Sequence, residues 1–335
     1  MSRRARLPLA CLASLMVLTG CGSTAADHRG APAGVVLDNC GRQTAVEQPP
    51  RRAVSLNQGS TELLLALGLA DRIAGSATWT EPVRADLAEA NARVPRLADG
   101  TPSLESVLTV EPDFVIGLYH AMFTDERVAT RDRFQELGVP TYLSPTSCLP
   151  ESAVLDKPVE LADIYREVLD VARIFGVPER GDALVARLRE RVARAQERVA
   201  ALKLQADFSA VFWFGQTESP YMAGSTGSPA IMARALGIRN AYADVASLWP
   251  QVSWEDVLRR DPDLIVLADL TREGPGQSMK SKVDFLTADP AVRQLGAVQA
   301  TRWLPMRGTE LNITISTVDG IEKLADTLVR LHGAP

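Results

Sequence analysis

The chain has 335 residues, a formal charge of −5 and 46% hydrophobic residues. Its negative charge disfavours a nucleic-acid partner, which would require a basic patch. Its length is enough for two domains of ordinary size, and beyond the N-terminal segment no apolar run reaches the 18 residues that indicate a transmembrane helix.

The first twenty residues have the pattern of an export signal. Three arginines in residues 3–6 precede an apolar run from Leu7 to Leu18. This run is too short to span a bilayer, and it is apolar all round, unlike the alternative of a periodic core helix. Residues 18–21, Leu-Thr-Gly-Cys, resemble a bacterial lipobox. We therefore expect Cys21 to be lipidated and to anchor the chain to a membrane, with plain secretion as the alternative.

The small, polar residues after Cys21 predict a flexible tether. Cys11 is lost with the signal, so Cys40 and Cys148 remain in the mature chain. In an exported protein, two remaining cysteines predict a disulfide. Two separate buried thiols are the alternative.

Strand and helix patterns alternate through the first half of the chain. Residues 52–56 predict a buried strand, and the stretch after Gly59-Ser60 predicts a helix that Ser60 or Thr61 caps and Gly68 ends. Further strands are predicted at 72–75, at 114–116 and after the helix in DRFQELGVPTYLS, and a helix is predicted at 104–110. This order predicts a parallel sheet flanked by helices.

The second half repeats this order. Strands are predicted at 209–214 and 264–267 and a helix at 227–237. Two blocks recur in both halves, namely GSTELLLALGL with GSPAIMARALGI, and SLESVLTVEPDFVIG with SWEDVLRRDPDLIVL, whose fifteen positions include six identities. We therefore expect two similar Rossmann-like α/β lobes, each with a mostly parallel sheet.

One long helix is predicted between the halves, from Pro178 to about Lys203. An apolar stripe follows three- and four-residue spacing through Leu184, Leu188, Val192, Ala195, Val199 and Leu202. Its position at the repeat boundary favours a rigid connection between the lobes over an ordinary surface helix of one domain.

The sequence disfavours an enzyme on this duplicated frame. Its three histidines are His28 in the tether, His120, and His332 near the C-terminus, too few internal ones for a His-rich metal site. No G-x-S-x-G elbow, G-x-G-x-x-G fingerprint or Walker A motif is present. We therefore expect no catalytic residues, metal site or cofactor.

Aromatic residues make up 5% of the chain, and several follow predicted strands. Because ligands of open parallel sheets bind beyond the carboxyl ends of the strands, these loops would meet in one cleft if the lobes face each other. Aromatic walls with a few charged groups are typical of small-molecule sites, although core packing is the alternative for each residue and especially for Trp213.

These features together resemble the substrate-binding proteins of ABC importers, in the subgroup for ferric siderophores, heme or cobalamin. The resemblance rests on the lipobox, the two repeated blocks and the long helix, and it covers about residues 50–332. The stretch WPQVSWEDVL is similar to a segment of the cobalamin-binding member. The resemblance implies modest lobe closure. We expect this division of the chain: signal peptide 1–20, tether 21–39, N-terminal lobe 40–177, inter-lobe helix 178–204 and C-terminal lobe 205–335.

In that family the glutamate of each repeated motif pairs with arginines on the two permease subunits. The positions that match here are Glu105 and Glu255. The alternative is that both only favour the first turn of a helix after Ser103 and Ser253. The two roles are compatible.

The resemblance also implies ligand contacts at Trp79, Tyr119, His120, Phe214, Tyr221, Trp249, Arg307 and Glu310. Arg307 could pair with a siderophore carboxylate or a heme propionate. The expected protein is a monomeric lipoprotein on the outer face of the cytoplasmic membrane that passes a ferric siderophore to an ABC permease. Cobalamin and heme are alternative ligands, and an orphan envelope sensor or scaffold is an alternative function.

Overall fold

The computed structural model describes residues 34–150, 158–202, 204–271 and 274–333. The export signal and the proposed lipidation site Cys21 lie outside these residues. None of the described helices is both long and apolar enough to cross a membrane.

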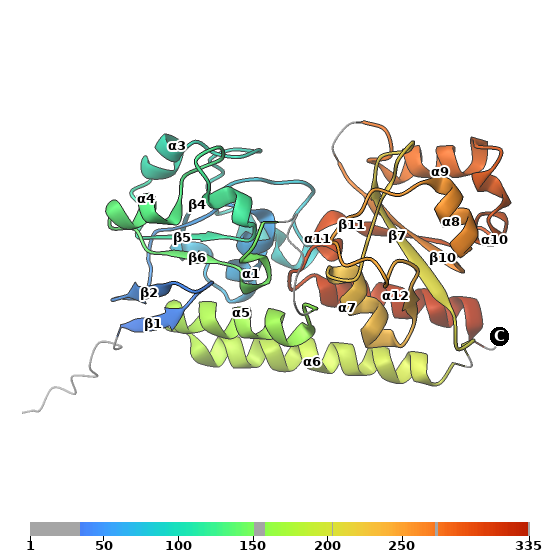
Figure 1. Ribbon diagram of the computed structural model, residues 1–335. Helices are drawn as coiled ribbons and strands as arrows, with labels where there is room; N and C mark the ends of the chain where they lie inside the picture. Colours follow the sequence, from blue (N-terminus) through green and yellow to red (C-terminus); the bar gives the residue numbers. More distant parts are fainter. Residues whose placement is uncertain (1–33, 151–157, 203, 272–273, 334–335) are drawn as a thin grey trace, which may run out of the picture. The chain divides into compact units, whose positions relative to one another are not determined.

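The first half of the described chain forms a parallel sheet with the strand order β4-β3-β5-β6 (Figure 1). Its strands are β3 (Ala53–Ser55), β4 (Ile73–Ser76), β5 (Phe114–Gly117) and β6 (Thr141–Leu143). Its helices are α1 (Gln58–Ala66), α2 (Ala88–Asn91), α3 (Leu104–Leu108), α4 (Arg131–Glu136) and α5 (Leu161–Ile174). Short 3-10 turns are η1 (Ala70–Arg72), η2 (Ala85–Leu87), η3 (His120–Phe123) and η4 (Pro145–Ser147).

The second half forms a sheet with the order β11-β10-β7-β8, and β9 also pairs with β7. All pairings in it are parallel except β7 with β8. Its strands are β7 (Ser209–Gly215), β8 (Tyr221–Met222), β9 (Arg239–Asn240), β10 (Leu264–Asp269) and β11 (Trp303–Arg307). Its helical segments are α7 (Ser228–Leu236), α8 (Trp254–Arg260), α9 (Met279–Ala288), η5 (Val292–Gln294), α10 (Gly296–Gln299), α11 (Gly308–Leu311) and α12 (Thr317–His332). The predicted α/β class with mostly parallel sheets is confirmed.

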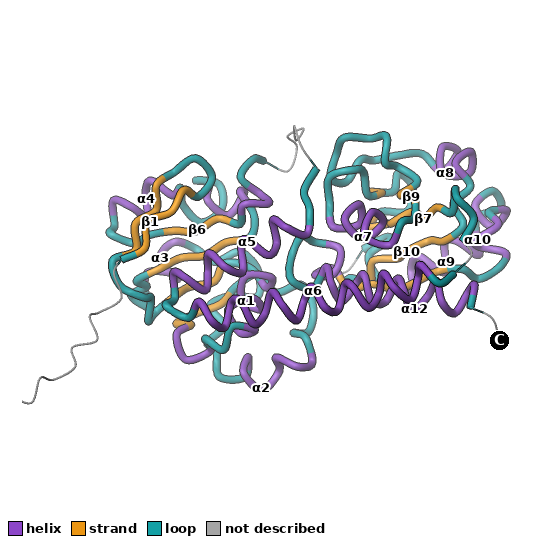
Figure 2. The backbone as a smooth tube through the Cα atoms, turned by 90° about the horizontal axis from the view of Figure 1, so that it is seen from below, coloured by secondary structure: helices purple, strands orange, loops and turns teal. Residues whose placement is uncertain are grey.

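Helix α6 (Pro178–Ala200) connects the two halves. It packs on α5 from the first half and on α7 and α12 from the second, as the two views show (Figures 1 and 2). The predicted apolar stripe is buried from Leu184 to Val199, whereas Leu202 lies beyond the helix end and is half-buried. At 1.5 Å per residue the helix is roughly 35 Å long. A single continuous helix therefore contacts the cores of both halves.

Two local predictions need correction. Strand β1 (Val35–Asp38) pairs antiparallel with β2 (Gln43–Val46), so ordered structure begins within the segment expected to be a tether. Helix α1 follows the N-cap Asn57, so neither Ser60 nor Thr61 caps it. Instead, the Thr61 hydroxyl donates to the Asn57 carbonyl (3.1 Å) from inside the first turn.

Cys40 and Cys148 form the predicted disulfide across a sequence separation of 108 residues. The alternative of two separate thiols is therefore excluded. The bond connects the turn after β1 to the end of the η4 segment. Both cysteines lie close to the end of β6, where the Asn39 side chain donates to the Leu143 carbonyl (2.8 Å).

Candidate ligand-binding pocket

Residues from both halves line one pocket, which encloses about 580 Å³ with open solvent included. Its walls follow the carboxyl ends of β5, β6 and β11 and the loops after β8 and β9, as expected for an open parallel α/β sheet. The lining residues are Leu118, Tyr119, Thr146, Ser147, Leu149, Pro150, Thr226, Leu248, Leu311, Asn312 and Ile313.

Among the residues that the structure describes, those that line the pocket are all uncharged. Most of the lining residues are apolar, and polarity comes from the hydroxyls of Tyr119, Thr146, Ser147 and Thr226 and from the Asn312 amide. A mostly apolar wall with a few hydrogen-bonding groups is typical of small-molecule sites. Among the described residues, no group of three or more His, Cys, Asp or Glu side chains is placed to hold a metal ion.

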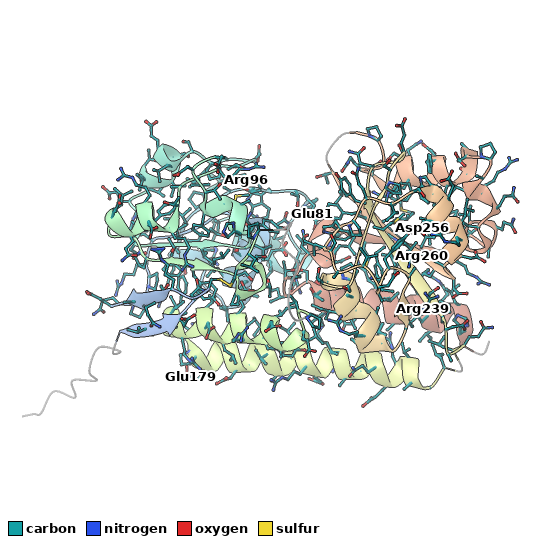
Figure 3. The ribbon with its side chains drawn as sticks, viewed as in Figure 1. Glu81, Arg96, Glu179, Arg239, Asp256 and Arg260 are labelled. Atoms are coloured by element: carbon teal, nitrogen blue, oxygen red, sulfur yellow. A yellow bond between two sulfur atoms is a disulfide. The ribbon has the colours of Figure 1, made fainter. Side chains whose placement is uncertain are left out.

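Buried polar contacts, which we call the seam, also join the two halves. The Glu81 carboxylate accepts from the backbone N–H groups of Gly308 (2.7 Å) and Thr309 (3.1 Å) at the start of α11 (Figure 3). The Ser316 hydroxyl donates to Glu62 (3.3 Å) on α1, and burial raises the pKa of Glu62 above its ordinary value. These contacts satisfy polar groups that would otherwise be costly to bury.

Asp319 extends the seam to the connecting helix. Its carboxylate lies 2.9 Å from Arg84 of the first half and 2.6 Å from Arg191 of α6. The side chain of Asp319 is 15% exposed, so these ion pairs are largely shielded from solvent. The seam therefore links both halves to α6 through charge pairs.

Two predicted ligand contacts, Arg307 and Glu310, belong to the seam. Glu310 is buried, and its carboxylate pairs with Arg307 (3.0 Å) and Lys323 (2.6 Å). Arg307 lines a separate, wider opening of about 1130 Å³, together with Glu81, Pro82, Asp269, Leu270, Thr271, Gly274 and Ser278. Both residues therefore have internal partners and lie outside the uncharged pocket.

Of the predicted aromatic contacts, the structure places Tyr119 in the pocket wall. His120 follows it as the first residue of η3 and is half-buried. Trp79 does not line the pocket. Its indole N–H donates to Ser76 Oγ (3.3 Å), and the Arg96 guanidinium lies 4.6 Å from its ring centroid.

The remaining predicted aromatics lie in the second half. The rings of Phe214 and Trp249 stack with centroids 4.5 Å apart, and Leu248 beside Trp249 lines the pocket. Tyr221 lies in β8 and pairs with Gln251 through an isolated bridge. Trp213 is fully buried, as the strand alternation predicted. Ligand contact by Phe214, Tyr221 and Trp249 stays a prediction.

Sequence reasoning missed the polar pocket residues Thr146, Ser147, Thr226 and Asn312. A signal was available, because Thr146 and Ser147 lie in the turn directly after β6. The rule that ligands bind beyond strand ends applies to such residues as much as to aromatics. Threonine and serine are common in turns, however, and their residue type alone did not distinguish them.

The duplicated motif has the same local structure in both halves. The Ser103 hydroxyl accepts from the Ser106 N–H (3.1 Å), and the Ser253 hydroxyl accepts from the Asp256 N–H (3.2 Å). Both serines are therefore N-caps. The valines four residues later, Val107 and Val257, are both fully buried.

The ends of the two motifs also match. Asp113 accepts from the backbone N–H groups of Arg51 (2.7 Å) and Arg52 (2.9 Å), just before β3. Asp263 accepts from the N–H of Ser209 (2.8 Å), the first residue of β7. Each aspartate thus connects two neighbouring strands of its own sheet. The repeated serine, valine and aspartate all have structural roles.

The repeated glutamates differ from these neighbours. Glu105 and Glu255 lie in the first turns of α3 and α8, where a carboxylate favours the helix dipole. Both are exposed, and neither takes part in an ion pair with the residues that the structure describes. Asp256, the residue after Glu255, in contrast pairs with Arg260 (3.0 Å) on the same helix (Figure 3). Both glutamates are therefore accessible to a partner.

The chain matches the periplasmic binding protein family (Peripla_BP_2) over residues 54–304. It is 22% identical over 280 residues to the "Uncharacterized ABC transporter substrate-binding lipoprotein YvrC" of Bacillus subtilis, covering 80% of this chain and 82% of that protein. It is 26% identical over 227 residues to the vitamin B12-binding protein of Yersinia pestis, covering 67% and 72%. The solved structure of an ABC-type Fe3+-hydroxamate transport system from Saccharomonospora viridis is 26% identical with a TM-score of 0.72, covering 90% and 99%.

The family match extends from β3 in the first sheet to β11 in the second and includes the helix that connects them. The chain therefore belongs to the periplasmic binding protein family.

Proposed function

We propose that this chain is the substrate-binding component of an ABC importer and that it captures a ferric siderophore. The surface of this siderophore is expected to carry no charged groups. The observation that carries this proposal is that the described residues lining the pocket are all uncharged. A charge buried there without a partner would cost several kcal/mol or more. The ligand is therefore expected to bring no net charge into the pocket.

A ferric trihydroxamate fits this requirement, because three singly charged hydroxamates neutralise Fe3+. The carboxylates of heme or the negative charge of a catecholate complex would require a cation in the wall. Arg307, the predicted partner for such an anion, pairs with Glu310 and lines the separate, wider opening rather than this pocket. The Fe3+-hydroxamate system among the similar structures supports the same class of ligand.

Cobalamin is the second candidate. The vitamin B12-binding relatives support it, as does the similarity of WPQVSWEDVL to the cobalamin-binding member. Cyanocobalamin has no net charge, because its phosphodiester anion balances the positive charge of the cobalt corrin, so it also satisfies the requirement of an uncharged pocket. Trp249 and its stacking partner Phe214 lie beside the lining residue Leu248 and would provide the outer aromatic surface for a larger ligand.

The test is a tryptophan-fluorescence titration of the chain without its first 21 residues. We expect saturable quenching by ferrichrome, a neutral ferric trihydroxamate, and weak or no quenching by hemin and by a ferric catecholate. Thr226→Val, which removes a pocket hydroxyl, should weaken binding, whereas Thr287→Val on the exposed face of α9 should not. Tight binding of cyanocobalamin alone would replace the siderophore with the second candidate. A folded protein that binds none of them would refute capture and favour an orphan interaction protein.

We also propose that Glu105 and Glu255 dock the protein onto the two subunits of the permease. The repeated serine, valine and aspartate side chains each have a structural contact, whereas these two carboxylates are exposed. An importer with two similar subunits requires two similar anionic contacts, and exposed charges of this kind steer association. Lipidation of Cys21 would hold the protein beside the permease, with residues 40–177 and 205–335 as the two lobes and 178–204 as the inter-lobe helix.

A further inference from the structure

A buried carboxylate lies behind one wall of the pocket. Glu167 projects from α5 and is 4% exposed. The Ser144 hydroxyl donates to Glu167 Oε2 (2.8 Å). The same hydroxyl lies 2.9 Å from Thr146 Oγ1, and either oxygen can be the donor. Because Thr146 lines the pocket, these three side chains form a continuous hydrogen-bonded relay from the core to the ligand space.

The surroundings of Glu167 favour its protonated form. Burial, with a further contribution from the negative charge of Asp170, raises the pKa of Glu167 to about 7, and the Ser144 hydrogen bond opposes this effect. Tyr142 on β6 is the other titratable group beside it, and the guanidinium groups of Arg166 and Arg173 act on Asp170. Among the described residues, no cation pairs with Glu167 itself.

The charge on Glu167 sets the direction of the relay. An ionised carboxylate can only accept, so Ser144 must donate to it and has no hydrogen left for Thr146. Thr146 then donates to Ser144 and presents only lone pairs to the pocket. A protonated Glu167 can donate to Ser144, which can then donate to Thr146. The hydrogen of Thr146 is then free to point into the pocket.

Building on the proposed ligand-binding function, we propose that Thr146 is a specificity-determining hydroxyl and that proton uptake by Glu167 switches it from acceptor to donor. The oxygens of a ferric trihydroxamate are acceptors, so such a ligand binds the protonated form more tightly. Binding is then coupled to proton uptake, and affinity falls as the pH rises through about 7. The expected difference is about fivefold to tenfold, the ratio that corresponds to one hydrogen bond.

The experiment measures the Kd of ferrichrome between pH 5.5 and 8.5, with calorimetry in buffers of different ionisation enthalpy to count the protons taken up. We expect the wild-type Kd to rise about fivefold to tenfold across this range. Glu167→Gln should keep the affinity of pH 5.5 throughout, because its amide can donate to Ser144. Ser144→Ala, which leaves Glu167 intact, should abolish the pH dependence. Thr146→Val should bind weakly at every pH.

The control is Glu179→Gln, the same exchange at an exposed position in the first turn of α6, and it should retain the wild-type profile. Binding that does not vary with pH, or a pH dependence that persists in Thr146→Val, would overturn the relay while leaving the proposed function intact. Absence of ferrichrome binding at every pH would refute the proposed siderophore function, and the relay with it.

Discussion

Replacing Glu167 with glutamine should stabilise the folded protein at high pH. The pKa of this carboxyl is about 7 in the folded state, against an ordinary value of 4.5. Because the folded value is the higher one, folding favours the protonated form. The contribution to stability is fully present below about pH 4.5 and is lost as the pH rises to about 7. Glutamine keeps the neutral form at every pH.

The size of the effect follows from the two pKa values. The difference between 4.5 and about 7 corresponds to about 3 kcal/mol of unfolding free energy. Since Glu167 is almost fully buried, solvent screening does not reduce this figure appreciably. Glu167→Gln should therefore match the wild type near pH 4.5 and exceed it by about 3 kcal/mol at pH 8.5.

Urea unfolding followed by circular dichroism at several pH values measures this difference. The matched control is Glu179→Gln, the same exchange at an exposed position on the first turn of α6 (Figure 3). It should change the unfolding free energy by less than about 0.5 kcal/mol and in the same way at every pH. If Glu167→Gln instead changes stability equally at low and high pH, folding does not raise the pKa of this carboxyl and the reasoning is wrong.

Three further changes test other parts of the structure. Replacing both Cys40 and Cys148 with serine should lower the unfolding free energy by up to about 5 kcal/mol, because the bond closes a loop of 108 residues; urea midpoints equal to those of the wild type would contradict this. Glu81→Ala should cost about 2–4 kcal/mol by calorimetry, since it leaves N–H groups at the start of α11 unsatisfied, and Glu81→Gln should cost less. The double variant Glu105→Ala, Glu255→Ala should keep its stability within about 0.5 kcal/mol and its ligand affinity, yet lose ligand uptake in cells; normal uptake would exclude docking through this pair.

The fold class was predictable because its signals are local. The buried stripe of α6 depends on three- and four-residue spacing, which the sequence displays directly. Strands β3 to β7 and β10 could be located from short apolar runs bounded by turn residues, whereas the two-residue strands β8 and β9 were not predicted. The duplication of the motif predicted two similar halves. The equivalent N-caps, Ser103 and Ser253, explain why serine recurs at the start of both motifs.

Parts of the fold with weak local signals were missed. Strand β1 lies at the end of the segment 21–39 that was expected to be a tether, and its partner β2 follows just beyond that segment. These strands are stabilised by contacts that the local pattern does not contain. The Arg131 side chain, for example, donates to the carbonyl and side chain of Asn39 (2.9 and 2.8 Å), 92 positions away in sequence.

The sequence by itself determined the α/β class, the connecting helix, the duplication and the exposed glutamates, because each depends on neighbouring residues. The roles of the site residues were decided by tertiary structure alone. Glu81 accepts hydrogen bonds from residues 308 and 309 across the seam, and Arg307 forms an ion pair with Glu310. Ser144 connects Thr146 to Glu167 through hydrogen bonds. Whether a charged side chain faces a ligand or another buried charge depends on which distant segments pack together, and no local periodicity records that pairing.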